Sequence, residues 1–518
     1  MGRKTDFYLY AAIFLAAASM AYWAAFAAAA YGSFHEYSDL GFYALSMYYD
    51  INYPGMVPGA QALVFGQHIS PDQLMLVPLY YLFSSPLTLL LAQDAVLSLT
   101  GLLVFIVARE VAGWEPLAMA MCLAYFLNPG VHGMLLFDYH AEALVMPLYI
   151  LVFYFYFKGS WRGFVPALIL LLGTMEVAPL IAMALGAGLG LFEAVGGGGD
   201  GRRGRYVMLG ALFAMAIVAI ALYNVAYYLV TSGYGAQGAQ TPAFLRVNPY
   251  PSVPIYEQQY AYQGMPARVN LTVPAFGGGG EAAQPLYFYY LYGLLIVLFG
   301  FGISIVFDIL PALVMLSPWL LEAFVFRVPY VVSIYAQYYG LVLGGTFVAA
   351  LLGARTLLKG EGAVGRIAAR RREAKALARG IALSAALALP LLVFAISLPI
   401  YLYMGSAGGY QSLLLQESVS GRMAVSQLES VMGLVPPNAT LMTQDSIMPH
   451  VLGREYVELV RYPKFFVPQY ILVDSSAALA TPYLGGGGTS SVYGYIANNT
   501  YSLYAVNGTA SLYRLEGH

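Results

Sequence analysis

The chain has 518 residues, of which 60% are hydrophobic and only 10% are charged. Soluble globular domains are about half apolar and a quarter charged, so this composition excludes an ordinary soluble protein and favours one that crosses a membrane many times. The formal net charge of -2, with Lys and Arg confined to short clusters, argues against a nucleic-acid partner. The single cysteine, Cys122, excludes an intrachain disulfide, so any external domain must be stable without one.

Eleven apolar stretches are long enough, or nearly long enough, to cross a bilayer as helices. The first of them has an apolar core of about 25 residues, which is longer than that of a signal peptide and indicates a retained span. Gly173, Glu176 and Pro179 interrupt the stretch 163–195, which we divide in two because the charge pattern requires an odd number of crossings. The predicted spans are 7–31, 86–108, 116–135, 143–157, 163–178, 179–195, 206–230, 286–306, 309–325, 336–354 and 379–404.

The loops between these spans alternate in charge. By the positive-inside rule, the N-terminus and every basic loop lie in the cytoplasm. The basic groups are Arg3 with Lys4, Arg109, Lys158 with Arg162, residues 202–205, and the run from Arg355 to Arg379. The Asn-x-Ser/Thr sequons fall in segments that the rule puts outside, and we predict a glycoprotein modified at Asn270, Asn438, Asn498 and Asn507. Both patterns predict a multi-pass cell-membrane protein with a cytoplasmic N-terminus and an extracellular C-terminus.

Two external loops and a tail follow from this topology. The loop 32–85 carries a short apolar piece, 74–83, that is too short to span and is expected at the membrane interface. The loop 231–285 is rich in Gly, Gln, Tyr and Pro and is expected to be irregular. In the tail, 411–431 reads as a helix, 469–474 as a buried strand, and 501–506 with 510–515 as a hairpin with a type I′ turn at Asn507-Gly508. We therefore predict an all-α transmembrane domain over 1–404 and a small extracytoplasmic α/β domain over 405–518.

The first external loop gathers polar residues beside the membrane. Asp39 follows the first span, with Glu36 one helical turn before it, and a carboxylate there could take a proton from a hydroxyl or bind a divalent cation. The alternative for Asp39 is a polar residue at a helix end that faces water, which is common and is the simpler explanation of Asp39 taken alone. His68 and Asp72 are four residues apart and could share a helical face, or could only bond within the loop. Neither pair has the spacing of a metal signature, so the cofactor stays open, with a divalent cation as a candidate.

A second polar cluster, Asp138, His140 and Glu142, lies at the same predicted membrane depth. Polar groups near hydrocarbon cost a few kcal/mol unless they face a cavity or a partner, so we predict a water-filled cavity; the alternative is a hydrated loop that touches no substrate. Glu176, flanked by apolar residues, could pair with a histidine or a cationic ligand, or bond to a helix end. Arg327, among apolar and aromatic neighbours, could hold a lipid phosphate or snorkel to the interface.

Four motifs together resemble the DUF2079 family of predicted archaeal and bacterial membrane proteins, which is grouped with the GT-C-type glycosyltransferases; the low charge and heavy Tyr, Ala and Gly usage would also suit an archaeon. The motifs are Tyr37-Ser38-Asp39-Leu40-Gly41-Phe42, Gly66-Gln67-His68-Ile69-Ser70-Pro71, Asp138-Tyr139-His140-Ala141-Glu142 and Thr174-Met175-Glu176. The resemblance implies a GT-C-like bundle with an external active site, in which the catalytic acid of the first loop maps onto Asp39. It also implies that the second acidic patch, from Asp138 to Glu142, lines the same cleft. Family members often have Lys-Glu-Asp where this chain has Thr174-Met175-Glu176, so a phosphate-binding lysine is missing here.

Three functions are compatible with these features. The first is a membrane glycosyltransferase that uses a polyprenyl-phosphate-linked sugar donor, with Asp39 catalytic and the other named acids, histidines and Arg327 binding substrate. The second is a non-enzymatic transporter or lipid flippase, for which Asp94 inside a predicted span is the only hint. The third is a catalytically inactive structural subunit of a membrane complex, which the missing lysine would fit. The first function requires a lipid donor and membrane lipids as partners.

Overall fold

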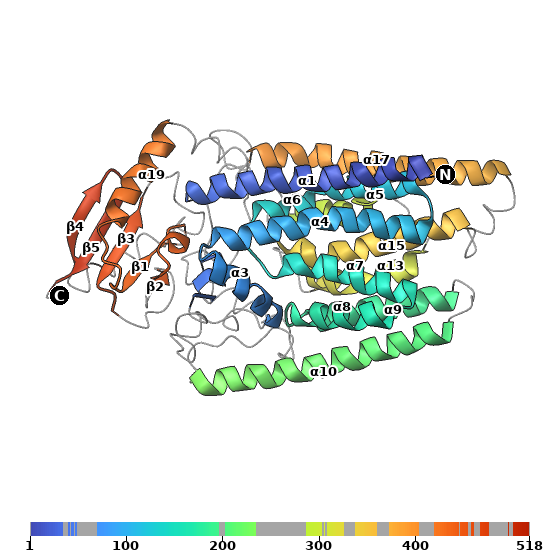
Figure 1. Ribbon diagram of the computed structural model, residues 1–518, viewed down its shortest axis with the longest axis horizontal. Helices are drawn as coiled ribbons and strands as arrows, with labels where there is room; N and C mark the ends of the chain where they lie inside the picture. The colour runs from blue at the N-terminus through green and yellow to red at the C-terminus, as the bar shows by residue number, and fades with distance from the viewer. Residues whose placement is uncertain are drawn as a thin grey trace.

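The computed structural model consists of a long helical bundle and a small sheet at one end of it (Figure 1). The two chain termini lie at opposite ends of the molecule (Figure 1). The structure describes residues 2–34, 40–41, 43–45, 47–48, 70–195, 202–234, 286–302, 305, 308–325, 337–359, 372–403, 419–444, 446–453, 457–459, 467–475, 496 and 501–516.

Each of the eleven predicted spans falls on one or more helices of the bundle. Six of the helices in the described residues are long and apolar enough to cross a membrane, or seven if the bent pair Glu115–Leu127 and Pro129–Leu136 forms one span, so the full count of eleven stays a prediction. The bundle comprises α1 (Gly2–Gly32), α4 (Leu87–Ala112), α5 (Glu115–Leu127), α6 (Pro129–Leu136), α7 (Glu142–Lys158), α8 (Trp161–Gly173), α9 (Ala178–Val195), α10 (Arg202–Tyr234), α12 (Leu286–Phe299), α13 (Ile309–Met315), α14 (Ser317–Leu320), α15 (Gly340–Lys359) and α17 (Arg372–Tyr403).

Two predicted spans are broken rather than continuous. The stretch 116–135 bends by 44° between α5 and α6 at Asn128-Pro129. Pro129 has no N–H to continue the α5 ladder, and the Asn128 side chain accepts the Gly130 N–H at 2.9 Å, which caps the start of α6. The stretch 309–325 divides into α13, the short α14 with Pro318 in its first turn, and the π-helical turn η4 (Leu321–Val325). The stretch 163–195 is two helices, α8 and α9, as the charge pattern required.

Helix α15 lies at the centre of the bundle, with almost all its side chains buried. Its glycines allow close packing: a Cβ at Gly344 would stand only 3.0 Å from the Tyr149 ring of α7. A Cβ at Gly340, where α15 begins, would collide with the main-chain carbonyl of Glu142. The start of α7, which carries part of the second acidic cluster, is thereby set directly against the start of α15.

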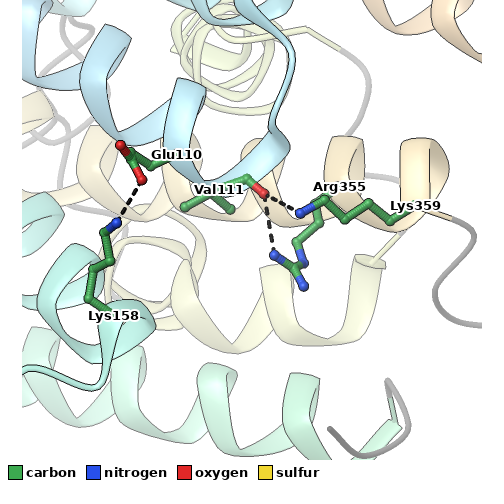
Figure 2. A network of polar contacts seen from close by, with 5 residues as sticks. All are labelled: Glu110, Val111, Lys158, Arg355 and Lys359. Carbon is green, nitrogen blue, oxygen red and sulfur yellow. Dashed lines mark hydrogen bonds and ion pairs between the residues drawn. The ribbon is translucent and has the colours of Figure 1, made fainter. Parts of the chain in front are cut away.

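One end of the bundle collects basic side chains (Figure 2). Lys158, at the end of α7, bonds Glu110 at 2.6 Å. The Val111 carbonyl, in the last turn of α4, accepts hydrogen bonds from Arg355 at 3.3 Å and Lys359 at 3.1 Å, which satisfies a helix-end carbonyl with positive charge. The sheet lies at the opposite end of the bundle (Figure 1). This separation agrees with the alternating charge of the loops, although which end faces the cytoplasm stays a prediction.

The C-terminal part is an α/β unit, as the tail sequence predicted. Its sheet has the order β2-β1-β3-β5-β4, with β1 parallel to β2 and β3, and β5 antiparallel to β3 and β4. The elements are α19 (Val419–Met432), β1 (Leu441–Thr443), the 3-10 turn η7 (Met448–His450), β2 (Val457–Leu459), β3 (Tyr470–Asp474), β4 (Tyr501–Asn507) and β5 (Ala510–Leu515). The expected helix, buried strand and hairpin are all present; the domain boundary at 404–405, just after α17, stays a prediction.

The turn of the hairpin differs from the expected type. Asn507 pairs with Ala510, so the two loop residues are Gly508 and Thr509. Gly508 has a φ of 58°, whereas Phe34 is the one non-glycine residue of the described chain with a positive φ. A type I′ turn needs a positive φ at both loop residues, so this turn is not type I′; glycine in the first loop position suits type II′.

Candidate functional site

The segment 137–141, between α6 and α7, carries the centre of the second acidic cluster. The Asp138 side chain is 2% exposed, and its carboxylate accepts the Tyr139 N–H at 3.0 Å and the Leu40 N–H at 2.7 Å. Leu40 directly follows Asp39 in the sequence. The second acidic cluster is therefore bonded to the motif that contains the predicted catalytic acid, although Asp39 and Glu36 themselves lie outside the described residues.

Gln93 of α4 fixes the path of this segment. Its Nε2 donates to the carbonyls of Met134 at 3.1 Å and Asp138 at 3.3 Å, and its Oε1 accepts the His140 N–H at 2.9 Å. The side chain is 3% exposed. A buried amide that satisfies three main-chain groups holds the loop in one conformation, because losing any of these bonds would leave a buried polar group unpaired.

His140 is buried among aromatic rings. Its ring centroid lies 6.0 Å from that of Tyr43 and 5.1 Å from that of Phe137. Its Nδ1 lies 3.2 Å from the Asp138 carbonyl, and a carbonyl oxygen can only accept, so this contact requires a proton on Nδ1. In the neutral ring, Nε2 is then the nitrogen that carries no proton.

The 3-10 turn η1 (Pro71–Met75) brings another acid into contact with this segment. The Tyr139 hydroxyl donates to Gln73 Oε1, and Gln73 Nε2 lies 3.5 Å from Asp72 Oδ1. Asp72 is 7% exposed, and its Oδ2 has no hydrogen-bond partner among the described residues. Burial raises the pKa of the Asp72 carboxyl to about 7, so both protonation states are populated near neutral pH.

The Tyr139 phenol interacts electrostatically with the carboxyl groups of both Asp72 and Glu142. Burial raises the pKa of the Tyr139 phenol well above its ordinary value, and the nearby carboxyls of Asp72 and Glu142 raise it further. Glu142, at the first turn of α7, is fully buried, and neither of its carboxyl oxygens has a hydrogen-bond partner among the described residues. A buried carboxyl group without a hydrogen-bond partner is costly, so Glu142 is a candidate for binding a polar group.

Glu176 joins the same region from the break between α8 and α9, where it is 5% exposed. Asp72 packs against Gly173 at the end of α8, where a Cβ would stand 3.9 Å from the Asp72 nitrogen. The Tyr223 hydroxyl of α10 donates to the Leu172 carbonyl at 2.7 Å, and the carboxyls of Glu176 and Asp72 both act electrostatically on this phenol. Acids from three separate parts of the chain thus gather beside Tyr139 and Tyr223.

These acids are buried in the described structure. That the segment 137–142 lines a water-filled cavity stays a prediction. No group of three His, Cys, Asp or Glu side chains in the described part of the chain is placed to hold a metal ion. The candidate divalent cation therefore gains no support from these residues. The piece 74–83, expected at the membrane interface, forms the end of η1 and α3 (Val77–Leu82), and it exposes Met75, Tyr81, Leu82 and Phe83 while Tyr80 is buried.

His68 and Arg327, like the sequons at Asn270 and Asn498, lie outside the described residues. Asn438 and Asn507 are exposed, as glycosylation would require. The Asn507 amide nitrogen, the atom that a glycan would modify, donates to Ser430 Oγ at 2.8 Å.

The sequence reasoning missed Gln73 and Gln93. Both contact the segment 137–141 from more than 40 positions away in the sequence. For Gln93 the available signal was an uncharged amide inside an apolar span, since such a group must find a partner there. Gln73 lies in the loop 32–85, outside the predicted spans, and carried no such signal.

The family model described as "Predicted membrane protein (DUF2079)" matches residues 13–247 and 279–480. The chain belongs to this family. The DUF2079 match includes Asp72, Gln93, the segment 137–142 and Glu176. No curated protein matches the chain. Among solved structures, the chain is similar to the one titled "Crystal Structure of ArnT from Cupriavidus metallidurans in the apo state", at 13% identity, 92% coverage of each chain and a TM-score of 0.42. A TM-score of 0.42 does not establish a shared fold.

Proposed function

We propose that this DUF2079 protein is a membrane glycosyltransferase of the GT-C type. It transfers a sugar from a polyprenyl-phosphate-linked donor to an acceptor at the external face of the membrane. The observation that most supports this proposal is the 2.7 Å hydrogen bond from the Leu40 N–H to the Asp138 carboxylate. It joins the motif of the first external loop to the second acidic cluster, as a shared active site requires.

The proposed chemistry is an inverting displacement. The acceptor hydroxyl oxygen attacks the anomeric carbon of the sugar, and Asp39 takes the hydroxyl proton. The bond between the anomeric carbon and the phosphate oxygen breaks, and the lipid phosphate leaves with the bonding electrons. An Asp near its ordinary pKa of about 4 is ionised and ready to accept a proton.

The remaining predicted site residues have supporting roles in this proposal. Asp138 holds the loop beside Asp39, and Arg327 offsets the charge of the leaving phosphate. Both carboxyl oxygens of Glu142 and Oδ2 of Asp72 are buried and have no hydrogen-bond partner in the part of the chain that the structure describes, so they are suited to hydrogen-bond sugar hydroxyls that enter the site. Glu36, His68, His140 and Glu176 complete the proposed substrate-binding set.

The test is a transfer assay on the full-length protein in lipid nanodiscs. A set of labelled polyprenyl-phosphate sugars is supplied, and release of free polyprenyl phosphate is measured. Asp39→Asn should lower turnover by about 100-fold or more, because the acceptor loses its base. Glu110→Gln, a matched acid-to-amide change in an exposed pair at the opposite end of the bundle, should leave turnover unchanged. Full activity in Asp39→Asn would remove Asp39 from the reaction.

Transport is the second candidate, and Asp94 is the observation that favours it. Asp94 is 2% exposed, lies two turns into α4, and has an Oδ2 without a hydrogen-bond partner among the described residues. Acids inside membrane helices often mark an ion or substrate path. A transporter would lose flux in Asp94→Asn, whereas the transferase should retain its turnover in that variant.

The third candidate, an inactive structural subunit, would fit the absent lysine at position 174. Thr174 occupies that position, is buried, and donates its hydroxyl to the Leu171 carbonyl at 2.8 Å. Copurification in a stoichiometric complex, with no turnover on any donor, would favour this candidate.

A further inference from the structure

The C-terminal sheet unit touches the end of α1 through the turn η7. The His450 ring stacks on Tyr31, with centroids 4.3 Å apart and an angle of 25° between the ring planes. His450 also lies against Phe34, whose ring centroid is 3.9 Å away. The Tyr31 hydroxyl also reaches the Pro449 carbonyl at 3.5 Å. The last turn of α1 is therefore held by aromatic contacts from a part of the chain more than 400 residues away.

Phe34 is held in an unfavourable backbone conformation. Its φ of 57° is in the left-handed region, which bulky residues rarely adopt. Its side chain is 2% exposed and belongs to the same apolar core as Ile447, Met448 and Leu472 of the sheet unit. Such a conformation persists only where the surrounding structure enforces it, and here the sheet unit supplies those contacts.

The same turn also contacts the chain just beyond Asp39. Met448 lies against Gly41, where a Cβ would stand 3.0 Å from the Met448 Cγ and 3.1 Å from its sulfur. Leu45, a few residues further, is 3% exposed and packs in the same core as Phe34. The two flanks of residues 35–39 are thus both in contact with η7, through His450 on one side and Met448 on the other.

The turn itself is firmly attached to the sheet. It follows β1, and the Ile447 and Met448 N–H groups both donate to the Gln444 carbonyl at 3.1 Å. The Gln444 side chain accepts the Asp474 N–H at 2.8 Å and donates to Ser446 Oγ at 3.2 Å, so it links the ends of the parallel strands β1 and β3 to the turn. The position of η7 is therefore set by the sheet.

We propose that Met448 and His450 are positioning residues, through which the sheet unit fixes both flanks of residues 35–39 and so orients Asp39 for transfer. This inference rests on the proposed function in assigning catalysis to Asp39. It makes the C-terminal unit a part of the active site. His450 acts here as a flat ring, since its Nε2 is buried without a hydrogen-bond partner among the described residues.

The test compares His450→Ala with His450→Phe in the full-length protein in nanodiscs. Loss of the ring in His450→Ala should lower kcat by about 10- to 100-fold, because a small misplacement of a catalytic group is costly, and should leave the KM for the donor within about threefold. His450→Phe keeps an aromatic ring and should restore kcat to within about threefold of the wild type. Hydrogen exchange should become faster at the Phe34 and Leu40 amides in His450→Ala only, while β3 and β5 stay protected.

The outcomes separate the positioning role from the proposed function. Wild-type kcat and wild-type exchange at Phe34 and Leu40 in His450→Ala would overturn the positioning role. Faster exchange in that variant, with no transfer by any form of the protein, would keep the contact and reject the glycosyltransferase. If His450→Ala loses protection in β3 and β5, Gly41→Val tests the same contact from the loop side. It should lower kcat with the sheet intact, and unchanged kcat would overturn the proposal.

Discussion

Burial raises the pKa of the Asp72 carboxyl by more than its hydrogen bonds lower it. Its pKa is raised to about 7 from an ordinary value of 3.8, with burial as the largest cause. The folded state therefore binds more protons than the unfolded state between about pH 4 and pH 7. The contribution of this group to stability is full below pH 4 and is lost as the pH rises through 7.

We expect Asp72→Asn to remove this pH dependence. Apparent melting temperatures of the wild type and the variant in nanodiscs should be similar near pH 4.5 and should diverge toward pH 7.5, with the variant the more stable. The difference at pH 7.5 corresponds to a few kcal/mol, from about 1.4 kcal/mol per pKa unit. Glu110→Gln, in an exposed pair, should show no such divergence. If the difference in melting temperature between the wild type and Asp72→Asn were the same at pH 4.5 and pH 7.5, the raised pKa of Asp72 would be contradicted.

At this scale the sequence predicts residue types better than their partners. Asp138, His140 and Glu142 could be recognised as a group because three polar residues beside a membrane must be stabilised together. The bonds from Gln93 and Gln73 to the segment 137–141 could not be predicted, since they depend on how α4 and η1 pack in three dimensions. The same is true of the hydrogen bond from Leu40 to Asp138, which joins two motifs 98 positions apart.

Among the elements, the junction of α15 with α7 is the most tightly packed contact near the acids. Gly340 begins α15, and a side chain there would collide with the Glu142 carbonyl. Gly210 lies in α10 with no atom within 4 Å of where its Cβ would be. The two glycines are therefore a matched pair for the same substitution.

Gly340→Ala should be strongly destabilising and should lower transfer, because main chain must move to admit the methyl group and Glu142 moves with it. Gly210→Ala should be neutral or more stable by up to about 1 kcal/mol, because alanine is the better helix former. Melting temperature and turnover measured on both variants check this. Equal melting temperatures and equal turnover in the two variants would contradict the close approach of α15 to α7.

Hydropathy predicted where the helices lie more reliably than it predicted where they are interrupted. All eleven predicted spans fall on helices because a run of apolar residues in a membrane has little alternative to helix. The bend at Asn128-Pro129 carries a sequence signal, a capping residue before a proline, but such a pair can also occur inside a kinked span. The division of 309–325 into α13, α14 and η4 depends on packing that no local pattern encodes.

At the scale of the whole molecule, the basic helix ends and the sheet unit lie at opposite ends of the bundle (Figure 1). The positive-inside rule assigns the basic end to the cytoplasm. The single cysteine of the sequence, Cys122, is buried, so we expect it not to react with a cysteine-labelling reagent. Lys158 and Leu434 are both exposed, one at each end of the molecule.

We expect an impermeant maleimide to label Leu434→Cys in intact cells and to label Lys158→Cys only after the membrane is opened. This follows if the sheet unit is extracellular. The reverse pattern would invert the topology and would remove the external active site with it.

We propose that acids from separate parts of the chain form one site for a lipid-linked sugar. The most direct measurement is a cryo-electron microscopy structure of the full-length protein in nanodiscs with a non-hydrolysable polyprenyl-phosphate sugar analogue. We predict that the lipid phosphate lies between Asp39 and Arg327 and that the sugar faces Asp39, beside the segment 137–142. A phosphate bound at the basic end of the bundle, or Asp39 and Asp138 facing separate surfaces, would contradict the proposed function.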